Sequence, residues 1–217
     1  MNVWVVIAAF NEEKHLGNVL KETKKCAKNV VVVDDGSHDK TSTIAKDAGV
    51  DVITLKQNQG KGFALRTGCD FAVKKGADVI VSLDADGQHP PSYIPELLKT
   101  LKGLDIVFTW RARDKHMPLT RAIGNWGLNF MMRILFGHKQ RDMLCGFMAY
   151  TASTYKKIRW NTKRYGVETE LTANCLTKKL KWAEIQIPTL YHEQGKGVKL
   201  GDAISIAFFI VWLRLTK

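Results

Sequence analysis

Short apolar runs rich in β-branched residues recur along the first half of the chain, and each run gives way abruptly to polar residues. Runs of this length and composition are typical of buried strands. The predicted strands are Val3–Ala9, Asn29–Val33, Val50–Leu55, Ala77–Leu83 and Leu104–Thr109.

Between these strands, the pattern predicts a helix after each of the first four. The predicted helices run from about Phe10 to Lys25, Lys40 to Ala48, Gly62 to Lys75 and Pro91 to Leu101. Glu12 and Glu13 would lie in the first turn of the first helix, where acids suit the helix dipole. Alternating strands and helices predict an α/β fold with a mostly parallel sheet and helices on both faces.

The second half of the chain has a different character. Pro118–Phe136 is a helical stretch rich in aromatic residues, and Asp142–Tyr150 is expected to be irregular and then extended. Gly166–Lys178 again has a helical pattern, Trp182–Ile187 predicts a last strand, and Tyr191–Gly201 predicts a loop.

Ala203–Leu213 contains 11 residues without a charge. A membrane span needs roughly 20 apolar residues. This segment therefore predicts an interfacial or core helix, unless the natural protein continues beyond Lys217.

Length and composition indicate one ordered domain over residues 1–217, because 45% of the residues are hydrophobic and 25% are charged. The net charge of +12 favours phosphate-rich partners or an anionic membrane surface. No nucleic-acid motif is present, so nucleic acid is not the expected partner.

The four cysteines form no C-x-x-C pair, which argues against zinc and indicates a reducing compartment. No signal peptide is expected either, since Met1-Asn2 leads straight into a strand.

Two carboxylates, Asp84 and Asp86, follow the strand Ala77–Leu83 directly. Residues i and i+2 of extended backbone point to the same side, so both can face one spot beyond the strand end, where α/β sheets bind ligands. Hard oxygen donors suit Mg²⁺ or Mn²⁺ with diphosphate oxygens as further ligands. The alternative is a polar turn that caps the next helix.

A second acid pair, Asp34-Asp35, ends the strand Asn29–Val33. Asp35 can accept hydrogen bonds from a nucleobase or ribose, although a turn with a helix cap explains the pair equally well. The glycine-containing loop Gly60-Lys61-Gly62 matches neither a Walker A motif nor the dinucleotide pattern.

Taken together, four motifs resemble the family 2 glycosyltransferases with the GT-A fold, and most of all their polyprenyl-phosphate (dolichyl-phosphate) mannose synthase branch. They cover about the first 115 residues in the family's order and spacing. The motifs are Ile7-Ala8-Ala9-Phe10-Asn11-Glu12-Glu13, Val31-Val32-Val33-Asp34-Asp35-Gly36-Ser37 with Asp39 and Thr41, Asn58-Gln59-Gly60-Lys61-Gly62, and Asp84-Ala85-Asp86-Gly87-Gln88-His89-Pro90. The family usually has proline at Ala8 and tyrosine at Phe10.

The resemblance implies a nucleotide-sugar-binding half over residues 1–115 and an acceptor-binding half over residues 116–217. Asp84, Asp86 and Gln88 would hold the metal, Mg²⁺ or Mn²⁺, with Asp86 also catalytic. The implied nucleotide-sugar contacts are Ala8, Phe10, Glu12, Val33, Asp35, Asp84, Ala85, Asp86, His192 and Lys199.

On the acceptor side, the resemblance implies that Arg111, Arg121 and Asn125 contact a phosphate, with both arginines counted as catalytic. Guanidinium pairs with phosphate oxygens bidentately. Trp110 replaces the family's serine before Arg111, and a solvated helix face is the alternative for Arg121. The match of the loop His192–Lys199 to the family is looser, because histidine replaces arginine and serine is absent. The alternative interpretation is a solvated basic loop.

The implied reaction is an inverting transfer of a hexose, mannose from GDP-mannose or glucose from UDP-glucose, to a polyprenyl phosphate at the cytoplasmic membrane face. One alternative is a soluble transferase to a hydroxyl, which would need a carboxylate base such as Glu168, Glu170 or Asp142. The lipid acceptor is favoured if the apolar segments Pro118–Phe136 and Ala203–Leu213 lie at a membrane interface. The alternative is that both segments are ordinary core helices. The alternative from another class is a non-catalytic basic adaptor that binds a membrane or nucleic acid. A membrane-protein partner is left open.

Overall fold

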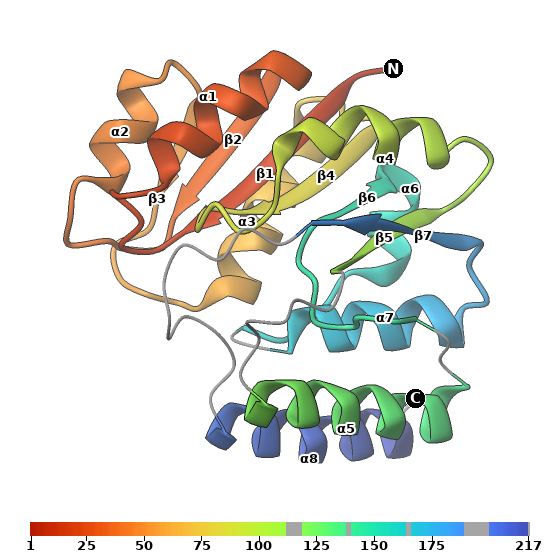
Figure 1. The fold of residues 1–217 in the computed structure, drawn as a ribbon. Coiled ribbons are helices and arrows are strands. Elements are labelled where there is room, and N and C mark those ends of the chain that lie inside the picture. Colours follow the sequence, from red (N-terminus) through yellow and green to blue (C-terminus); the bar gives the residue numbers. More distant parts are fainter. Residues whose placement is uncertain (112–118, 138–139, 164–165, 189–199, 217) are drawn as a thin grey trace.

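The computed structural model describes residues 1–111, 119–137, 140–163, 166–188 and 200–216, with the backbone alone for residues 119–123, 125 and 200–204. Its centre is a seven-stranded sheet with the strand order β3-β2-β1-β4-β6-β5-β7 (Figure 1). The strands are β1 Val3–Ala9, β2 Asn29–Asp34, β3 Asp51–Thr54, β4 Val79–Asp84, β5 Ile106–Arg111, β6 Met148–Thr151 and β7 Trp182–Ile187.

All strand pairs are parallel except those of β6, which runs antiparallel to both β4 and β5. The prediction of a mostly parallel sheet is therefore confirmed. The central strands are buried on both faces, because valine and isoleucine occupy successive positions rather than alternate ones. The expected extended segment before Tyr150 is β6.

Two helical layers cover the two faces of the sheet (Figure 1). Helices α1, α2 and α4 bury one face, and α3, α6 and α7 bury the other. The helices are α1 Leu16–Cys26, α2 Thr41–Asp47, α3 Lys61–Lys74, α4 Ile94–Thr100 after a 3₁₀ turn at Pro91–Tyr93, α5 Leu119–Phe136, α6 Ala152–Ile158, α7 Val167–Thr177 and α8 Leu200–Thr216.

Helices α5 and α8 form a further layer. Figure 1 shows them side by side beyond α7. Their shared core includes Leu128 and Met132 of α5, Ile206 and Ile210 of α8, and Ala173 of α7. These two helices therefore pack on the rest of the molecule at α7.

Helix α1 begins at Leu16, so the prediction that Glu12 and Glu13 lie in its first turn is wrong. The backbone N–H of Glu12 donates to Thr41 Oγ1 at 2.8 Å, and that of Glu13 donates to Asp39 Oδ2 at 3.1 Å. These long-range bonds hold the segment after β1 against the segment after β2, and the helix starts only beyond them.

Helix α6 was not predicted from the sequence. It begins with a cap, because Thr151 Oγ1 accepts a hydrogen bond from the backbone N–H of Thr154 at 3.0 Å. Since it is a single short helix directly after β6, its apolar residues read equally well as a continued strand.

Gly68 lets α3 pack closely on β1 and β2. A Cβ there would overlap Val6 Cγ1 and lie 3.0 Å from Val33 Cγ2. Because these neighbours belong to central strands, Gly68→Ala should lower the free energy of unfolding by roughly 1–3 kcal/mol. Urea denaturation measures this change.

Gly127→Ala is the matched control, because a Cβ at this helical position of α5 has no neighbour within 4 Å. It should leave stability unchanged or raise it by about 0.5–1 kcal/mol. Equal losses for both variants would contradict the close approach of α3 to the sheet.

Candidate active site

The site lies where the strand order of the sheet reverses. The strands β2 and β3 extend from one side of β1, and β6, β5 and β7 extend from the far side of β4. Ligands of open α/β sheets bind in the crevice beyond the carboxyl ends of the strands at such a reversal, which here is the crevice at β1 and β4. Ala8 of β1 lies opposite Asp84 of β4 in this pair.

Alternation along β4 decides which face Asp84 serves. Val81 and Leu83 belong to the core beneath α1 and α4, whereas Ile80 belongs to the core beneath α3 and α7. Asp84 shares the side of Ile80 because side chains alternate along a strand. Its carboxylate consequently lies among residues of α3 and α7.

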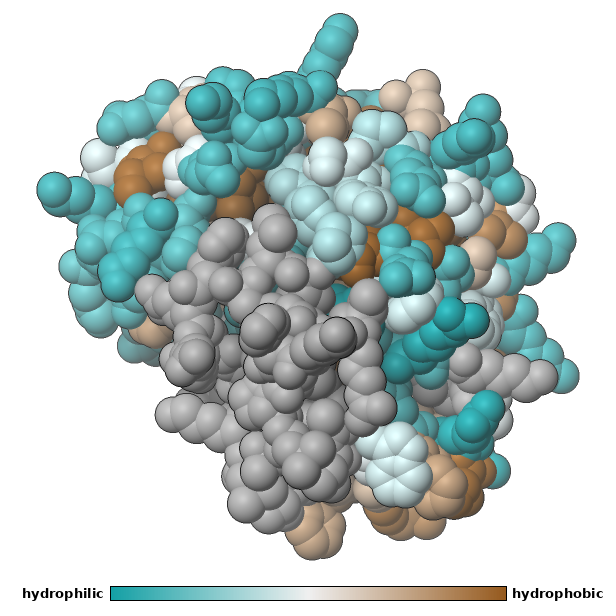
Figure 2. Space-filling view, in the orientation of Figure 1, coloured by the Kyte–Doolittle hydropathy of each residue, from teal (hydrophilic) through white to brown (hydrophobic). Residues whose placement is uncertain are grey.

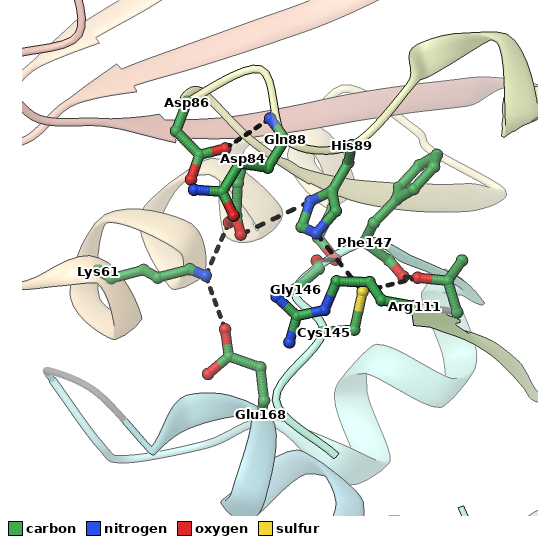
Figure 3. Close-up of polar contacts among 12 residues, drawn as sticks. Lys61, Asp84, Asp86, Gln88, His89, Arg111, Cys145, Gly146, Phe147 and Glu168 are labelled. Atoms are coloured by element: carbon green, nitrogen blue, oxygen red, sulfur yellow. Dashed lines mark hydrogen bonds and ion pairs between the residues drawn. The ribbon is translucent and has the colours of Figure 1, made fainter. Parts of the chain in front are cut away.

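Lys61, the first residue of α3, bridges two carboxylates from distant parts of the chain (Figure 3). Its Nζ lies 2.7 Å from Asp84 Oδ1 and 2.7 Å from Glu168 Oε1 of α7. The side chain of Glu168 is 8% exposed and that of Lys61 is 26% exposed, so this contact is largely but not fully withdrawn from water. The bridge joins α3, the end of β4 and α7.

The bridge keeps both groups charged. Burial alone would lower the pKa of Lys61, but the carboxylates of Asp84 and Glu168 raise it above its usual value. Burial alone would raise the pKa of Asp84, yet the neighbouring Lys61 ammonium and His89 hold it below its usual value. Lys61 is thus a permanent cation at the end of β4.

Asp86 and Gln88 lie beside Asp84 in the turn after β4 (Figure 3). The backbone N–H of Gln88 donates to Asp86 Oδ1 at 3.0 Å, which orients that carboxylate. No group of three or more His, Cys, Asp or Glu side chains in the described part of the chain is arranged to hold a metal. Two carboxylates and one amide oxygen nevertheless suit Mg²⁺ or Mn²⁺ when a bound diphosphate supplies further ligands.

His89 is the buried residue that follows Gln88 in this turn. Its ring stacks on Phe147, its Nε2 lies 3.5 Å from Cys145 Sγ, and its Nδ1 lies 3.8 Å from Asp84 Oδ2. Burial lowers the pKa of His89, but Cys145 and Asp84 outweigh it and raise that pKa above its ordinary value. A raised pKa favours a second positive charge directed at Asp84.

Gly146 shows how tightly the bridge is enclosed. A Cβ at this position would lie 2.8 Å from both Asp84 Oδ2 and Lys61 Nζ. Only glycine fits there without a shift of these groups. This gives a physical reason for a glycine at position 146.

The carboxylate of Asp35 is engaged by the loop before α3. Its Oδ1 accepts from the backbone N–H of Gln59 at 2.7 Å, and its Oδ2 accepts from that of Gly60 at 2.8 Å. Asp35 therefore fixes the loop that carries Lys61. Its predicted contact with the nucleotide stays a prediction.

Other predicted donor-side residues differ in accessibility. Phe10 is 40% exposed, and Ala8 and Glu12 are partly exposed at the end of β1. Val33 and Ala85 are buried, and Val33 Cγ2 faces the close approach of Gly68. His192 and Lys199 lie outside the described residues.

On the acceptor side, Arg111 at the end of β5 forms a two-pronged ion pair with Asp142. Arg111 Nε donates to Asp142 Oδ2 at 2.6 Å, and its Nη2 donates to Oδ1 at 3.1 Å. Asp142 thereby fixes the plane of the guanidinium. Arg121 and Asn125 are in α5, and their side chains lie outside the described residues.

Glu170 anchors the segment between α6 and α7. Its Oε2 accepts the backbone N–H groups of Asn161 and Thr162 at 3.1 and 2.9 Å, and the hydroxyl of Thr162 at 2.5 Å. Glu170 is 5% exposed. These contacts assign it to local structure.

Comparison with known sequences identifies the family. The family model for glycosyl transferase family 2 matches residues 4–159. The chain belongs to this family. This confirms the resemblance found in the motifs and includes the whole crevice at β1 and β4.

Two relatives match over nearly the full length of the chain. One is the UDP-N-acetylglucosamine–dolichyl-phosphate N-acetylglucosaminyltransferase of Methanococcus voltae, 31% identical over 99% of this chain and 97% of that protein. The other is the undecaprenyl-phosphate mannosyltransferase of Micrococcus luteus, 28% identical over 95% of this chain and 91% of that protein.

A solved structure supports the fold. Glucosyl-3-phosphoglycerate synthase from Mycobacterium tuberculosis, in complex with Mn²⁺, UDP and phosphoglyceric acid, superimposes with a TM-score of 0.76. The match covers 99% of this chain and 78% of that one at 20% identity. The GT-A fold predicted from the sequence is confirmed.

Lys61 was not among the residues assigned to the site from the sequence. Its loop was one of the four motifs that carried the resemblance, but no role was assigned to Lys61, and Glu168 was considered only as a candidate base. The available signal was the position of Lys61 at the start of a helix beside the crevice. Its two carboxylate partners come from β4 and α7, and such pairings are not readable from local spacing.

Proposed function

We propose that this glycosyltransferase moves a hexose, with inversion, from a nucleotide-diphosphate sugar to a polyprenyl phosphate at a membrane surface. One observation carries the proposal. Helices α5 and α8 form a layer with apolar residues on its outer face, and this layer packs on α7. Glu168 of α7 forms an ion pair with Lys61 at the crevice. The proposed donor site therefore lies on one side of α7, and the α5–α8 layer, whose outer face is apolar, lies on the other side.

On the donor side, the crevice between β1 and β4 would take the nucleotide, with Ala8, Phe10, Glu12, Val33 and Asp35 around it. A Mg²⁺ or Mn²⁺ ion held by Asp84, Asp86 and Gln88 would neutralise charge on the leaving diphosphate. The remaining predicted donor contacts are Ala85, His192 and Lys199.

In the proposed step, an oxygen of the acceptor phosphate forms a bond to the anomeric carbon from the face opposite the diphosphate. The bond from that carbon to the diphosphate oxygen breaks, and the diphosphate leaves with the electron pair. A phosphate is already anionic at neutral pH, so no protein base is needed. Arg111, Arg121 and Asn125 would hold its charge during attack.

The carboxylates proposed as bases for a hydroxyl acceptor are each engaged by a partner. Glu168 pairs with Lys61, Asp142 pairs with Arg111, and Glu170 binds the segment at Asn161 and Thr162. A general base must be able to reach the proton that it abstracts. These pairings favour the phosphate acceptor over the hydroxyl.

The membrane role rests on the outer face of α5 and α8. Figure 2 shows hydrophobic side chains gathered at the end of the molecule where these helices lie. Trp126 is 66% exposed and Phe208 is 74% exposed. Within the described parts of the chain, every helix is too short or too polar to cross a membrane. Peripheral attachment on the cytoplasmic side is the mode that we propose.

The sugar and the base are proposed as mannose from GDP-mannose or glucose from UDP-glucose. The relatives named above use N-acetylglucosamine and mannose, so UDP-N-acetylglucosamine belongs in the same test. Incubation of the full chain with each labelled nucleotide sugar and a short polyprenyl phosphate should give labelled lipid with one donor. Label transferred only to a free sugar would support a hydroxyl acceptor, and no transfer at all would support a non-catalytic adaptor.

The first functional prediction concerns the metal. Asp86→Ala should reduce transfer on the order of 10²-fold or more, because it removes an oxygen ligand and the charge compensation of the leaving group. Thermal unfolding should change little, since Asp86 is partly exposed and lies in a turn. Transfer by the parent should also stop in excess chelator and return with Mg²⁺ or Mn²⁺; full turnover in chelator would contradict the metal assignment.

The second prediction concerns the acceptor. Arg121→Ala should cut transfer to polyprenyl phosphate on the order of 10²-fold or more, as loss of a preorganised charge contact does. Donor hydrolysis by water should fall much less, because Arg121 would not serve the donor diphosphate. Measuring both reactions side by side separates the two roles.

Glu168→Gln and Glu170→Gln are the comparison variants, and each should retain measurable transfer to the lipid phosphate. A hydroxyl acceptor predicts the reverse result, in which one carboxylate is indispensable and Arg121 is expendable. Parent-level transfer by Arg121→Ala would refute the acceptor assignment.

The third prediction concerns the membrane. The double variant Phe208→Glu and Trp212→Glu should weaken binding to anionic vesicles by about tenfold or more, because each aromatic side chain contributes about 1.5–3 kcal/mol when buried. Vesicle sedimentation at several salt concentrations measures it, and binding should weaken with salt.

The matched control is Asn18→Glu with Thr43→Glu, which adds the same charge to exposed positions of α1 and α2. These helices cover the opposite face of the sheet from α7 (Figure 1). Equal losses in both double variants would mean that net charge alone, and not the α5–α8 face, governs attachment.

A further inference from the structure

The Lys61 ammonium lies between two carboxylates at the end of β4. It lies 2.7 Å from a carboxylate oxygen of Asp84 and 2.7 Å from one of Glu168. Asp84 is also one of the predicted metal ligands, together with Asp86 and Gln88. One side chain of the protein therefore competes with a metal for the same carboxylate.

We infer that Lys61 is an internal counter-ion that keeps divalent cations weakly bound in the empty crevice, so that the metal is held firmly only together with the donor diphosphate. This inference rests on the proposed function, because it assigns the order in which that site is filled. It concerns a residue to which neither the motifs nor the family resemblance assigned a role.

The enclosure of Lys61 supports this role. The absence of a side chain at Gly146 leaves the space in which Nζ and the Asp84 carboxylate meet, since a Cβ would lie 2.8 Å from each. The loop that carries Lys61 is held by Asp35 through the N–H groups of Gln59 and Gly60. The start of α3 is consequently held at the site, and the ammonium of Lys61 lies between its two carboxylate partners.

Charge explains the expected effect. With Lys61 present, one of the two negative charges of Asp84 and Glu168 is compensated before any ligand binds. A bound diphosphate would add negative charge next to Asp84 and would supply oxygen ligands for the metal. Mg²⁺ is usually held in proteins by one or two carboxylates together with such phosphate oxygens. Without Lys61, Asp84 and Glu168 would be left uncompensated at short range and would attract a free cation.

The test measures binding of Mn²⁺ alone to the full chain, by electron paramagnetic resonance of the unbound ion. Lys61→Met should bind Mn²⁺ more tightly than the parent by about tenfold or more, because a unit charge next to the ligand is removed. A merely structural role for Lys61 predicts the opposite, since a damaged site binds metal more weakly. Unchanged or weaker binding would overturn the inference.

Lys74→Met is the matched control, because it removes the same charge from an exposed position at the other end of α3. It should leave Mn²⁺ binding at the parent level. If it tightens binding as much as Lys61→Met does, the effect comes from net charge and the inference is wrong.

Two further variants keep the test decisive if Lys61→Met fails to fold. The double variant Lys61→Met with Glu168→Gln replaces the buried pair by neutral side chains and should still bind Mn²⁺ more tightly than the parent, since Asp84 is released. Glu168→Gln alone leaves Lys61 on Asp84 and should not tighten binding. Tighter binding by Glu168→Gln, or weaker binding by the double variant, would overturn the inference.

The outcome is separable from that of the proposed function. Mn²⁺ binding requires neither a nucleotide sugar nor a lipid. Transfer by the parent with no change of Mn²⁺ affinity in Lys61→Met would refute the counter-ion alone. Tighter Mn²⁺ binding in that variant without transfer by the parent would refute the proposed function alone.

Discussion

The parallel pairing of β1 with β4 is the constraint on which the site depends. The register sets Ala8 opposite Asp84, and Ala9 opposite Asp34 of β2, so the polar ends of three strands meet at one edge of the sheet. The strand order reverses between β1 and β4, and ligands of open α/β sheets bind beyond the strand ends at such a reversal. Because side chains alternate along β4, Asp84 points toward α3 and α7, so the other members of its ion-pair bridge come from these two helices.

The segment between α6 and α7 fixes α7 to the start of α3. Trp160 Nε1 donates to the carbonyl of Gly62 at 2.8 Å, and the N–H of Phe63 donates to the carbonyl of Lys163 at 3.0 Å. Glu170 of α7 holds the same segment through its backbone N–H groups. The first turns of α3 and α7 are therefore locked together, which is why Lys61 can serve carboxylates from both halves.

The sequence predicted those features that depend on local composition. The runs of valine and isoleucine marked β1, β2 and β4, and the acids at their ends marked the crevice, because a buried strand leaves no place for charge until it ends. Features set by distant partners were not predictable. The late start of α1 follows from bonds to Thr41 and Asp39, and the Lys61 bridge follows from the meeting of α3, β4 and α7.

The outer face of the α5–α8 layer is apolar and exposed. Helices α5 and α8 use one side each to pack on one another and on α7, while Trp126, Phe130, Phe208 and Trp212 remain exposed on the outside. Large contiguous apolar patches on soluble proteins mark interaction surfaces. A lipid surface would satisfy this face and would also bring an acceptor phosphate to the correct side of the molecule. Packed helices lie about 8–10 Å apart. Because α7 and the α5–α8 layer both lie between this exposed face and the Lys61 bridge, two helical layers separate the apolar surface from the carboxylates at the end of β4.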